Sequence, residues 1–160
     1  MAIQTGAKMP AGTFGTMTEA GAGAVTTEEL FAGKKVVLVS VPGAFTPTCS
    51  AAHLPGFVSH ADEILGKGID TIAFMAVNDV HVMNAWGKDQ GVGDKISMLA
   101  DGNGEYAAAL ELDFDGTPFG MGRRGQRFAI VVDDGVATHV AVEAPGKFEV
   151  SSAEAVLESL

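Results

Sequence analysis

The amino-acid sequence predicts an α/β fold, with a central mixed sheet flanked by helices. Continuous apolar runs rich in β-branched residues alternate with helical segments, which is typical of parallel strands joined by helices. Near the C-terminus an Asp-Gly turn lies between two apolar runs and indicates a hairpin, which adds antiparallel strands. The 160 residues contain no internal repeat or long polar linker, so we expect one domain over residues 1–160.

The first half of the chain leads from an irregular segment into the predicted sheet. Residues 1–34 are rich in Gly, Ala and Thr and predict irregular structure or a short hairpin. Residues 35–41 are a continuous β-branched run and predict a buried central strand. A loop over residues 42–45 then leads to a helix over residues 46–65, which two glycines bring to an end.

The second half continues the alternation and ends in a hairpin and a helix. The predicted elements are a strand over 70–77, a helix to about 88, a strand over 96–99, a helix over 103–110, a loop over 111–126, strands over 127–132 and 136–142, and a helix over 152–160. Polar residues cap these helices in the prediction. The candidates are Asn78 or Asp79, then Asn103, then Ser151 or Ser152.

Composition excludes several classes of function. The formal net charge of -10 disfavours nucleic acid and anionic membrane surfaces as partners, since both carry negative charge. We find neither a signal-peptide pattern nor an apolar run long enough for a membrane helix, so we expect a cytoplasmic protein. The single cysteine excludes an intramolecular disulfide and a Cys-only zinc site, and it fits a reducing compartment.

The loop after the first buried strand carries the candidate chemistry. Thr46 is a good helix N-cap, and Pro47 then falls at the first helical position, where its missing N–H has no consequence. Cys49 therefore lies in the first helical turn, where unpaired N–H groups and the helix dipole favour a thiolate over a thiol. A thiolate is the reactive nucleophile, so we interpret Cys49 as a catalytic residue.

Other interpretations of Cys49 remain open on the residues alone. A lone cysteine is often a buried structural residue. His53 follows at helical spacing, so a Cys–His hydrolase or a metal site is conceivable, although the other histidines offer no matching ligand spacing. We favour the interpretation that His53 packs or hydrogen-bonds near the helix start.

Three arginines within five positions offer a cation for the thiolate: Arg123, Arg124 and Arg127. A fixed guanidinium near Cys49 favours the thiolate and stabilises charge on a departing oxygen. The sequence does not decide which of the three arginines reaches Cys49.

These motifs resemble those of peroxiredoxins. Pro42, Thr46 and Cys49 match the signature Pro-x-x-x-Thr-x-x-Cys, and the run VPGAFTPTCSAAHLPGF over Val41–Phe57 is similar to the peroxiredoxin-5 (type II) subfamily. Further matching motifs are VND (77–79), AWG (85–87), LAD (99–101) and RFAIVVDDG (127–135). The similarity stays in register from about Lys35 to the C-terminus.

The resemblance implies a thioredoxin fold and the reduction of hydrogen peroxide or alkyl hydroperoxides. By this resemblance Cys49 attacks the peroxide and becomes a sulfenic acid. Thr46 hydrogen-bonds the peroxide and the thiolate, Pro42 shields the site from water, and Arg127 is the catalytic arginine. No metal, haem or flavin cofactor is implied, because the sulfur itself carries the redox chemistry.

The resemblance also implies residues around the reacting sulfur and a set of partners. Substrate contacts are expected from Gly43, Phe45, Arg124 and Phe119, with the two aromatic rings at the pocket or at a homodimer contact. Residues 148–153, where some relatives carry a resolving cysteine, contain none. We therefore expect an external thiol to reduce the sulfenic acid, with glutathione and glutaredoxin as first choice and thioredoxin as second.

A second class of function uses the same thiol differently. A redox-regulated binding protein or chaperone would oxidise slowly at Cys49 and change its partners or its oligomeric state. The rate of reaction with hydrogen peroxide separates this sensor from a peroxidase.

Overall fold

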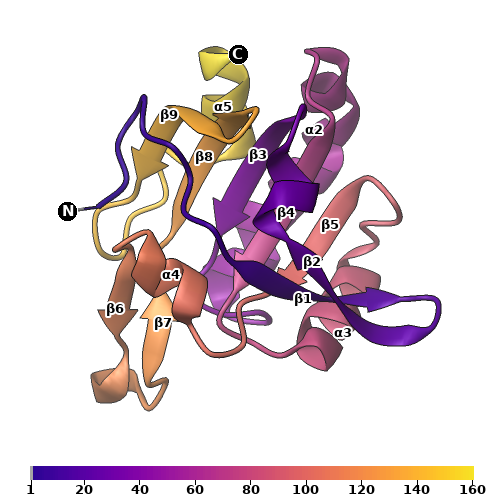
Figure 1. Ribbon diagram of the computed structural model, residues 1–160. Coiled ribbons are helices and arrows are strands. Elements are labelled where there is room, and N and C mark those ends of the chain that lie inside the picture. The colour runs from indigo at the N-terminus through magenta and orange to yellow at the C-terminus, as the bar shows by residue number, and fades with distance from the viewer. Residues whose placement is uncertain (1) are drawn as a thin grey trace.

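A computed structural model describes residues 2–160 and is built around one mixed sheet (Figure 1). Seven strands lie in the order β2-β1-β5-β4-β3-β8-β9. β3, β4 and β5 are parallel, and the strands outside them are antiparallel to their neighbours. The strands of this sheet are β1 (Thr13–Thr18), β2 (Gly21–Thr26), β3 (Lys35–Ser40), β4 (Thr71–Ala76), β5 (Ile96–Ala100), β8 (Phe128–Asp133) and β9 (Val136–Val142).

Helices cover both faces of the sheet. They are α1 (Thr27–Phe31), a π-helical segment η1 (Cys49–His53), α2 (Leu54–Gly66), α3 (Val80–Gln90), α4 (Glu105–Ala109), the 3₁₀ turn η2 (Thr117–Phe119) and α5 (Ala153–Ser159). The predicted α/β fold with a mixed sheet flanked by helices is therefore confirmed. Among residues 2–160, none of the helices has the length and apolar character needed to cross a membrane.

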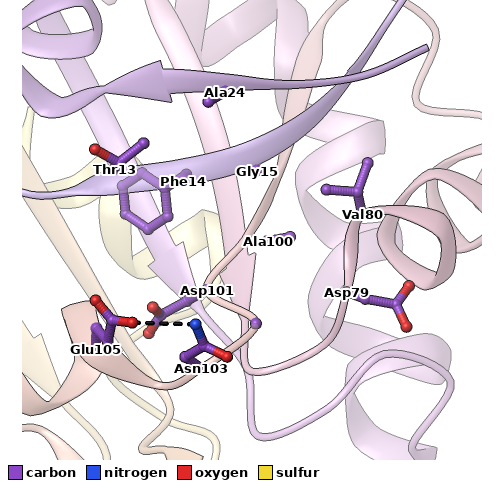
Figure 2. A pocket seen from close by; sticks show the side chains of 11 residues that line it. Thr13, Phe14, Gly15, Ala24, Asp79, Val80, Ala100, Asp101, Asn103 and Glu105 are labelled. Atoms are coloured by element: carbon purple, nitrogen blue, oxygen red, sulfur yellow. Dashed lines mark hydrogen bonds between the residues drawn. The ribbon is translucent and has the colours of Figure 1, made fainter.

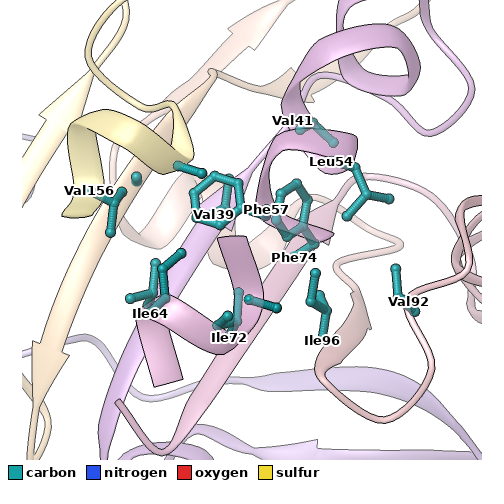
Figure 3. Packing of buried hydrophobic residues seen from close by; sticks show 14 of the residues in the cluster. Val39, Val41, Leu54, Phe57, Ile64, Ile72, Phe74, Val92, Ile96 and Val156 are labelled. Carbon is teal, nitrogen blue, oxygen red and sulfur yellow. The ribbon is translucent and has the colours of Figure 1, made fainter. Parts of the chain in front are cut away.

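Successive side chains of β3 point to opposite faces of the sheet, and both sets are buried. Val37 and Val39 join the cluster under α2, α3 and α5, where Phe57 and Phe74 also pack (Figure 3). Val36 and Leu38 belong to the second cluster, under α1 and α4. A strand buried on both faces is a continuous apolar run in the sequence, which explains why β3 could be predicted correctly.

The strand order brings distant segments to one edge of the sheet. β3 and β4 are parallel, so the loops after them emerge side by side. β8 is antiparallel to β3, with Ser40 opposite Phe128, so Arg127 lies next to the end of β3. The loop after β3, the loop after β4 and the start of β8 therefore meet at this edge of the sheet.

The observed elements differ from the predicted ones in three places. Residues 111–126 are not only a loop, because β6 (Asp113–Asp115) and β7 (Arg123–Gly125) pair there as a small separate hairpin. Helix α1 was not predicted, although Thr26 and Glu29 form a capping box at its start. α4 does not begin with Asn103 as its cap, because the Asp101 carboxylate accepts hydrogen bonds from the first amides of that helix.

Candidate active site

Cys49 lies at the start of the helix that comes after β3. Pro47 is the first helical residue, directly after Thr46, as predicted, but the Thr46 hydroxyl does not cap the helix because its partners are the Cys49 sulfur and the Gly43 carbonyl. Helical turns then widen over η1, where the Leu54 N–H donates to the Cys49 carbonyl five residues earlier. The Cys49 side chain is fully buried, with 0% of its surface exposed.

Two side-chain donors converge on the sulfur. Thr46 Oγ1 is 2.8 Å from Cys49 Sγ, and Arg127 Nη2 is 3.1 Å from it. Thr46 Oγ1 is also 2.7 Å from the Gly43 carbonyl oxygen. A hydroxyl has one proton to donate, so the Thr46 proton serves either the sulfur or the Gly43 carbonyl. A thiolate accepts the hydrogen bond from the Thr46 hydroxyl, whereas a thiol donates its own proton to Thr46 Oγ1 and leaves the hydroxyl to donate to the Gly43 carbonyl.

Polar contacts and steric fit hold the loop before Cys49. The Ala44 N–H donates to Asn78 Oδ1, at 2.9 Å, so the segment after β4 supports the loop after β3. Gly43 lies so close to Arg124 and Thr46 that a Cβ there would meet both side chains at 3.2 Å. Phe45 adopts a left-handed backbone conformation, with φ of 63°, which turns the chain just before Thr46.

The structure separates the three arginines that the sequence could not distinguish. Arg127 reaches the sulfur. Arg123 forms an ion pair with Asp113 in the β6–β7 hairpin. Arg124 donates to the carbonyl oxygens of Met121, Val77 and Pro42, and so braces the loop that carries Pro42. The substrate contact predicted for Arg124 stays a prediction.

His53 connects this site to the C-terminal part of the chain. Its Nδ1 is 2.6 Å from Arg127 Nη1, and its Nε2 is 2.9 Å from the Ser151 carbonyl oxygen. His53 is completely buried, as the preferred interpretation of close packing near the helix start requires. Burial first, and then the positive charge of Arg127, lower the pKa of His53 from 6.5 to about 3.

An apolar cavity of about 500 Å³ opens beside these groups. Pro42, Arg127, Phe114 and Phe119 are among the residues that line it, together with the 143–147 segment. The Phe119 side chain is 77% exposed. Phe45 does not line this cavity; its ring is half exposed and lies 6.5 Å from the Trp86 ring. The roles predicted for both aromatic residues stay predictions.

A second cavity, of about 300 Å³, has a different lining that does not include Cys49 (Figure 2). Asp79 and Asp101 line it, between β1 and the start of α3. Both carboxylates are already engaged, since Asp79 caps α3 and Asp101 accepts from the amides of α4. Residues 2–160 contain no group of three His, Cys, Asp or Glu side chains arranged to hold a metal.

The fold and the site together define a class. A thioredoxin-like arrangement of a mixed sheet and helices presents one cysteine at a helix start, with a hydroxyl and a guanidinium directed at its sulfur. One cysteine at a helix start with two hydrogen-bond donors directed at its sulfur is an arrangement typical of redox-active thiol proteins.

The comparisons with known proteins give the family. The chain belongs to the Redoxin family, whose model matches residues 4–157, and its relatives are peroxiredoxins. It is 53% identical over 138 residues to chloroplastic peroxiredoxin-2E of Arabidopsis thaliana, covering 85% of this chain and 59% of that protein. The resemblance inferred from the motifs is therefore confirmed.

Solved structures agree with this assignment. Reduced Prx3 of Vibrio vulnificus in complex with hydrogen peroxide matches with a TM-score of 0.94 and 50% identity, covering 98% of both chains. Peroxiredoxin 5 of Alvinella pompejana matches with a TM-score of 0.86 and 34% identity, over 98% of this chain and 97% of that one. The chain spans about three fifths of two chloroplastic relatives, 59% and 62% of their lengths.

Proposed function

We propose that this protein is a thiol peroxidase that reduces hydrogen peroxide and alkyl hydroperoxides through Cys49. The observation that carries the proposal is the pair of donors, Thr46 and Arg127, within hydrogen-bonding distance of one buried sulfur. The apolar cavity lined by Arg127, which contacts the sulfur, offers space for the organic part of a hydroperoxide. Membership of the peroxiredoxins supports the same chemistry.

The first step in this proposal is a displacement on oxygen. The Cys49 thiolate attacks one peroxide oxygen, so an S–O bond forms as the O–O bond breaks. The sulfur is oxidised to a sulfenic acid, and the other oxygen leaves with the bonding electron pair and takes a proton as water or alcohol. Arg127 stabilises the charge that develops on the departing oxygen, and Thr46 orients the peroxide.

The second step needs an external reductant, because the chain has only one cysteine. A first thiol condenses with the sulfenic acid, releasing water and forming a mixed disulfide. A second thiol attacks that disulfide and returns Cys49 as a thiolate. We propose glutathione with glutaredoxin as the reductant and thioredoxin as the alternative. We also propose a homodimer in which the exposed Phe45 and Phe119 rings become buried.

Stoichiometric oxidation and subsequent turnover test the function. One equivalent of hydroperoxide should consume one thiol rapidly in the wild-type protein, and turnover should require glutathione with glutaredoxin, or thioredoxin. Cys49→Ser should have no measurable turnover while keeping the far-ultraviolet circular dichroism of the wild type. Turnover by Cys49→Ser, or a wild-type rate no greater than that of an ordinary free thiol, would exclude the peroxidase. The slow rate would favour the redox sensor.

A further inference from the structure

The contact between His53 and Arg127 fixes the direction of a hydrogen bond. A guanidinium can only donate, so His53 Nδ1 must accept from Arg127 Nη1. The Ser151 carbonyl can only accept, so His53 Nε2 must carry the ring proton and donate to it. The two partners together therefore select one neutral tautomer of His53.

The surroundings of His53 also keep the ring uncharged. Phe57, Phe74 and Phe148 lie around it, with ring centroids 5.7, 5.5 and 4.8 Å from that of the imidazole. Phe148 also lies below the guanidinium of Arg127, 5.7 Å from its central carbon. A second positive charge beside Arg127 in this apolar shell is strongly disfavoured, in agreement with the lowered pKa of His53.

The acceptor of His53 is itself held in place by a buried carboxylate. Glu143 accepts hydrogen bonds from the backbone amides of Glu149, Val150 and Ser151 and from the Ser151 hydroxyl, at 2.7 to 2.9 Å. Burial alone would raise the pKa of Glu143, but these hydrogen bonds outweigh it and lower the pKa. The Ser151 carbonyl therefore has a fixed position, and a continuous line of contacts runs from Glu143 to Cys49.

We propose that His53 is a positioning residue, whose neutral imidazole holds the Arg127 guanidinium so that its other nitrogen points at the Cys49 sulfur. The proposal rests on the thiol peroxidase function of Cys49. A carboxylate at this place would also orient Arg127, but its negative charge would offset the cation that the thiolate needs. An imidazole lone pair orients the guanidinium and leaves its positive charge available to the sulfur.

Two amide substitutions separate the two hydrogen bonds of His53. Asn places a polar atom near the position of Nδ1, so His53→Asn keeps an acceptor for Arg127 and loses the donor to Ser151. Gln places its amide near Nε2, so His53→Gln keeps the donor to Ser151 and loses the acceptor. His53→Leu keeps apolar volume and loses both hydrogen bonds. A purely structural role for His53 predicts no advantage of Asn over Gln.

The readouts are the thiolate fraction of Cys49, from its ultraviolet absorbance, and the rate of its oxidation by hydrogen peroxide. The thiolate absorbance reports on Cys49 alone, because the chain has one cysteine. The fluorescence of Trp86, the single tryptophan, follows the oxidation, because its Nε1 donates to the hydroxyl of Ser50, next to Cys49 in the chain. We expect the rate at neutral pH to fall by about tenfold or more in His53→Gln and His53→Leu, as for a lost hydrogen bond to a charged group, and to stay within about threefold in His53→Asn. The thiolate fraction should fall in the same two variants.

His60→Gln is the matched control, because His60 lies on α2 and its ring contacts the Gly56 carbonyl and the Glu154 carboxylate rather than Arg127 or Cys49. It should change neither readout. Wild-type rates in His53→Leu, or equal losses in His53→Asn and His53→Gln, would overturn the positioning role. Slow oxidation of the wild type would overturn the peroxidase function alone, since the thiolate fractions of the variants would still test His53.

Discussion

Two helices begin at the same edge of the sheet, and their first turns are built differently. α3 comes after β4, and its first turn is capped by the Asp79 carboxylate, which accepts from the Val82 N–H at 2.8 Å. The helix after β3 begins next to it with Thr46, whose hydroxyl faces the Cys49 sulfur and the Gly43 carbonyl. One polar side chain stabilises a helix, whereas the other contacts the Cys49 sulfur. The comparison shows that the helix carrying Cys49 has no side-chain cap from Thr46, because the Thr46 hydroxyl contacts the sulfur and the Gly43 carbonyl instead.

Asn78 links the two helix starts. It precedes the cap of α3 and accepts from Ala44 in the loop before Cys49. The start of α3 thus supports the start of the helix that carries Cys49. Changes at the first should therefore alter stability, whereas changes at the second should alter the chemistry of the sulfur.

The largest effect is expected at Thr46. Thr46→Val keeps the shape of the side chain and removes the donor to the sulfur, so Cys49 oxidation by hydrogen peroxide should slow by about ten- to a hundredfold, the range for a hydrogen bond to a charged group. Stopped-flow fluorescence of Trp86 measures this rate. Thr46→Ser retains the hydroxyl and should restore most of it. Equal rates in the Val and Ser variants would show that the hydroxyl is unimportant.

The second-largest effect concerns stability at acid pH, and it compares one histidine from each helix start, His53 and His81. The pKa of His53 is about 3 in the folded state and 6.5 ordinarily, so below pH 6.5 the unfolded chain gains a proton that the folded chain does not. His53 therefore causes stability to fall as pH drops from about 6.5 to 3. Between pH 7 and pH 5 the free energy of unfolding should therefore fall by about 2 kcal/mol more in the wild type than in His53→Leu, which lacks the titrating group.

Urea unfolding at the two pH values measures this difference. His81 occupies the first turn of α3 and is exposed, so His81→Gln is the control and should leave the acid sensitivity as in the wild type. An unchanged acid sensitivity in His53→Leu would contradict the neutral state assigned to His53.

The smallest effect is expected at the ordinary helix start. Asp79→Ala removes the cap of α3 and should lower the free energy of unfolding by about 1 kcal/mol. The rate of Cys49 oxidation should stay unchanged, because the Asp79 carboxylate is engaged with α3 rather than with the loop that carries Cys49. Asp79→Asn, which retains an accepting oxygen, should recover most of the stability. A slowed oxidation in Asp79→Ala would show that the two helix starts are more tightly coupled than their contacts indicate.

Local sequence patterns predicted many of the strands, helix starts and turns of this protein. The β-branched run of β3, the Pro47 helix start and the Asp134-Gly135 turn, where both residues have positive φ, are short-range signals that the structure reproduces. The capping box of α1 was equally local, and its Thr26–Glu29 spacing was available in the sequence.

The supporting contacts of the site were not predictable in this way. His53 meets Ser151 across 98 positions of the chain, and Arg127 meets Cys49 across 78. Such pairs depend on strand order rather than on local spacing. Arg123 and Arg124 resemble Arg127 in sequence, but they belong to the separate β6–β7 hairpin, where the sequence pattern predicts only a loop. Glu143 gave no local signal of its carboxylate contacts.

The π-turn at Cys49 has a geometric consequence for the whole helix. Each residue of an α-helix advances the side-chain direction by about 100°, so one extra residue in a turn changes the rotational phase of every later residue relative to the earlier ones. Cys49, at the first position of the wide turn, faces Arg127, and after the turn Leu54 and Phe57 pack in the core against the sheet. A single helix can thus meet two demands on its orientation, one set by the contacts of the sulfur and the other by packing.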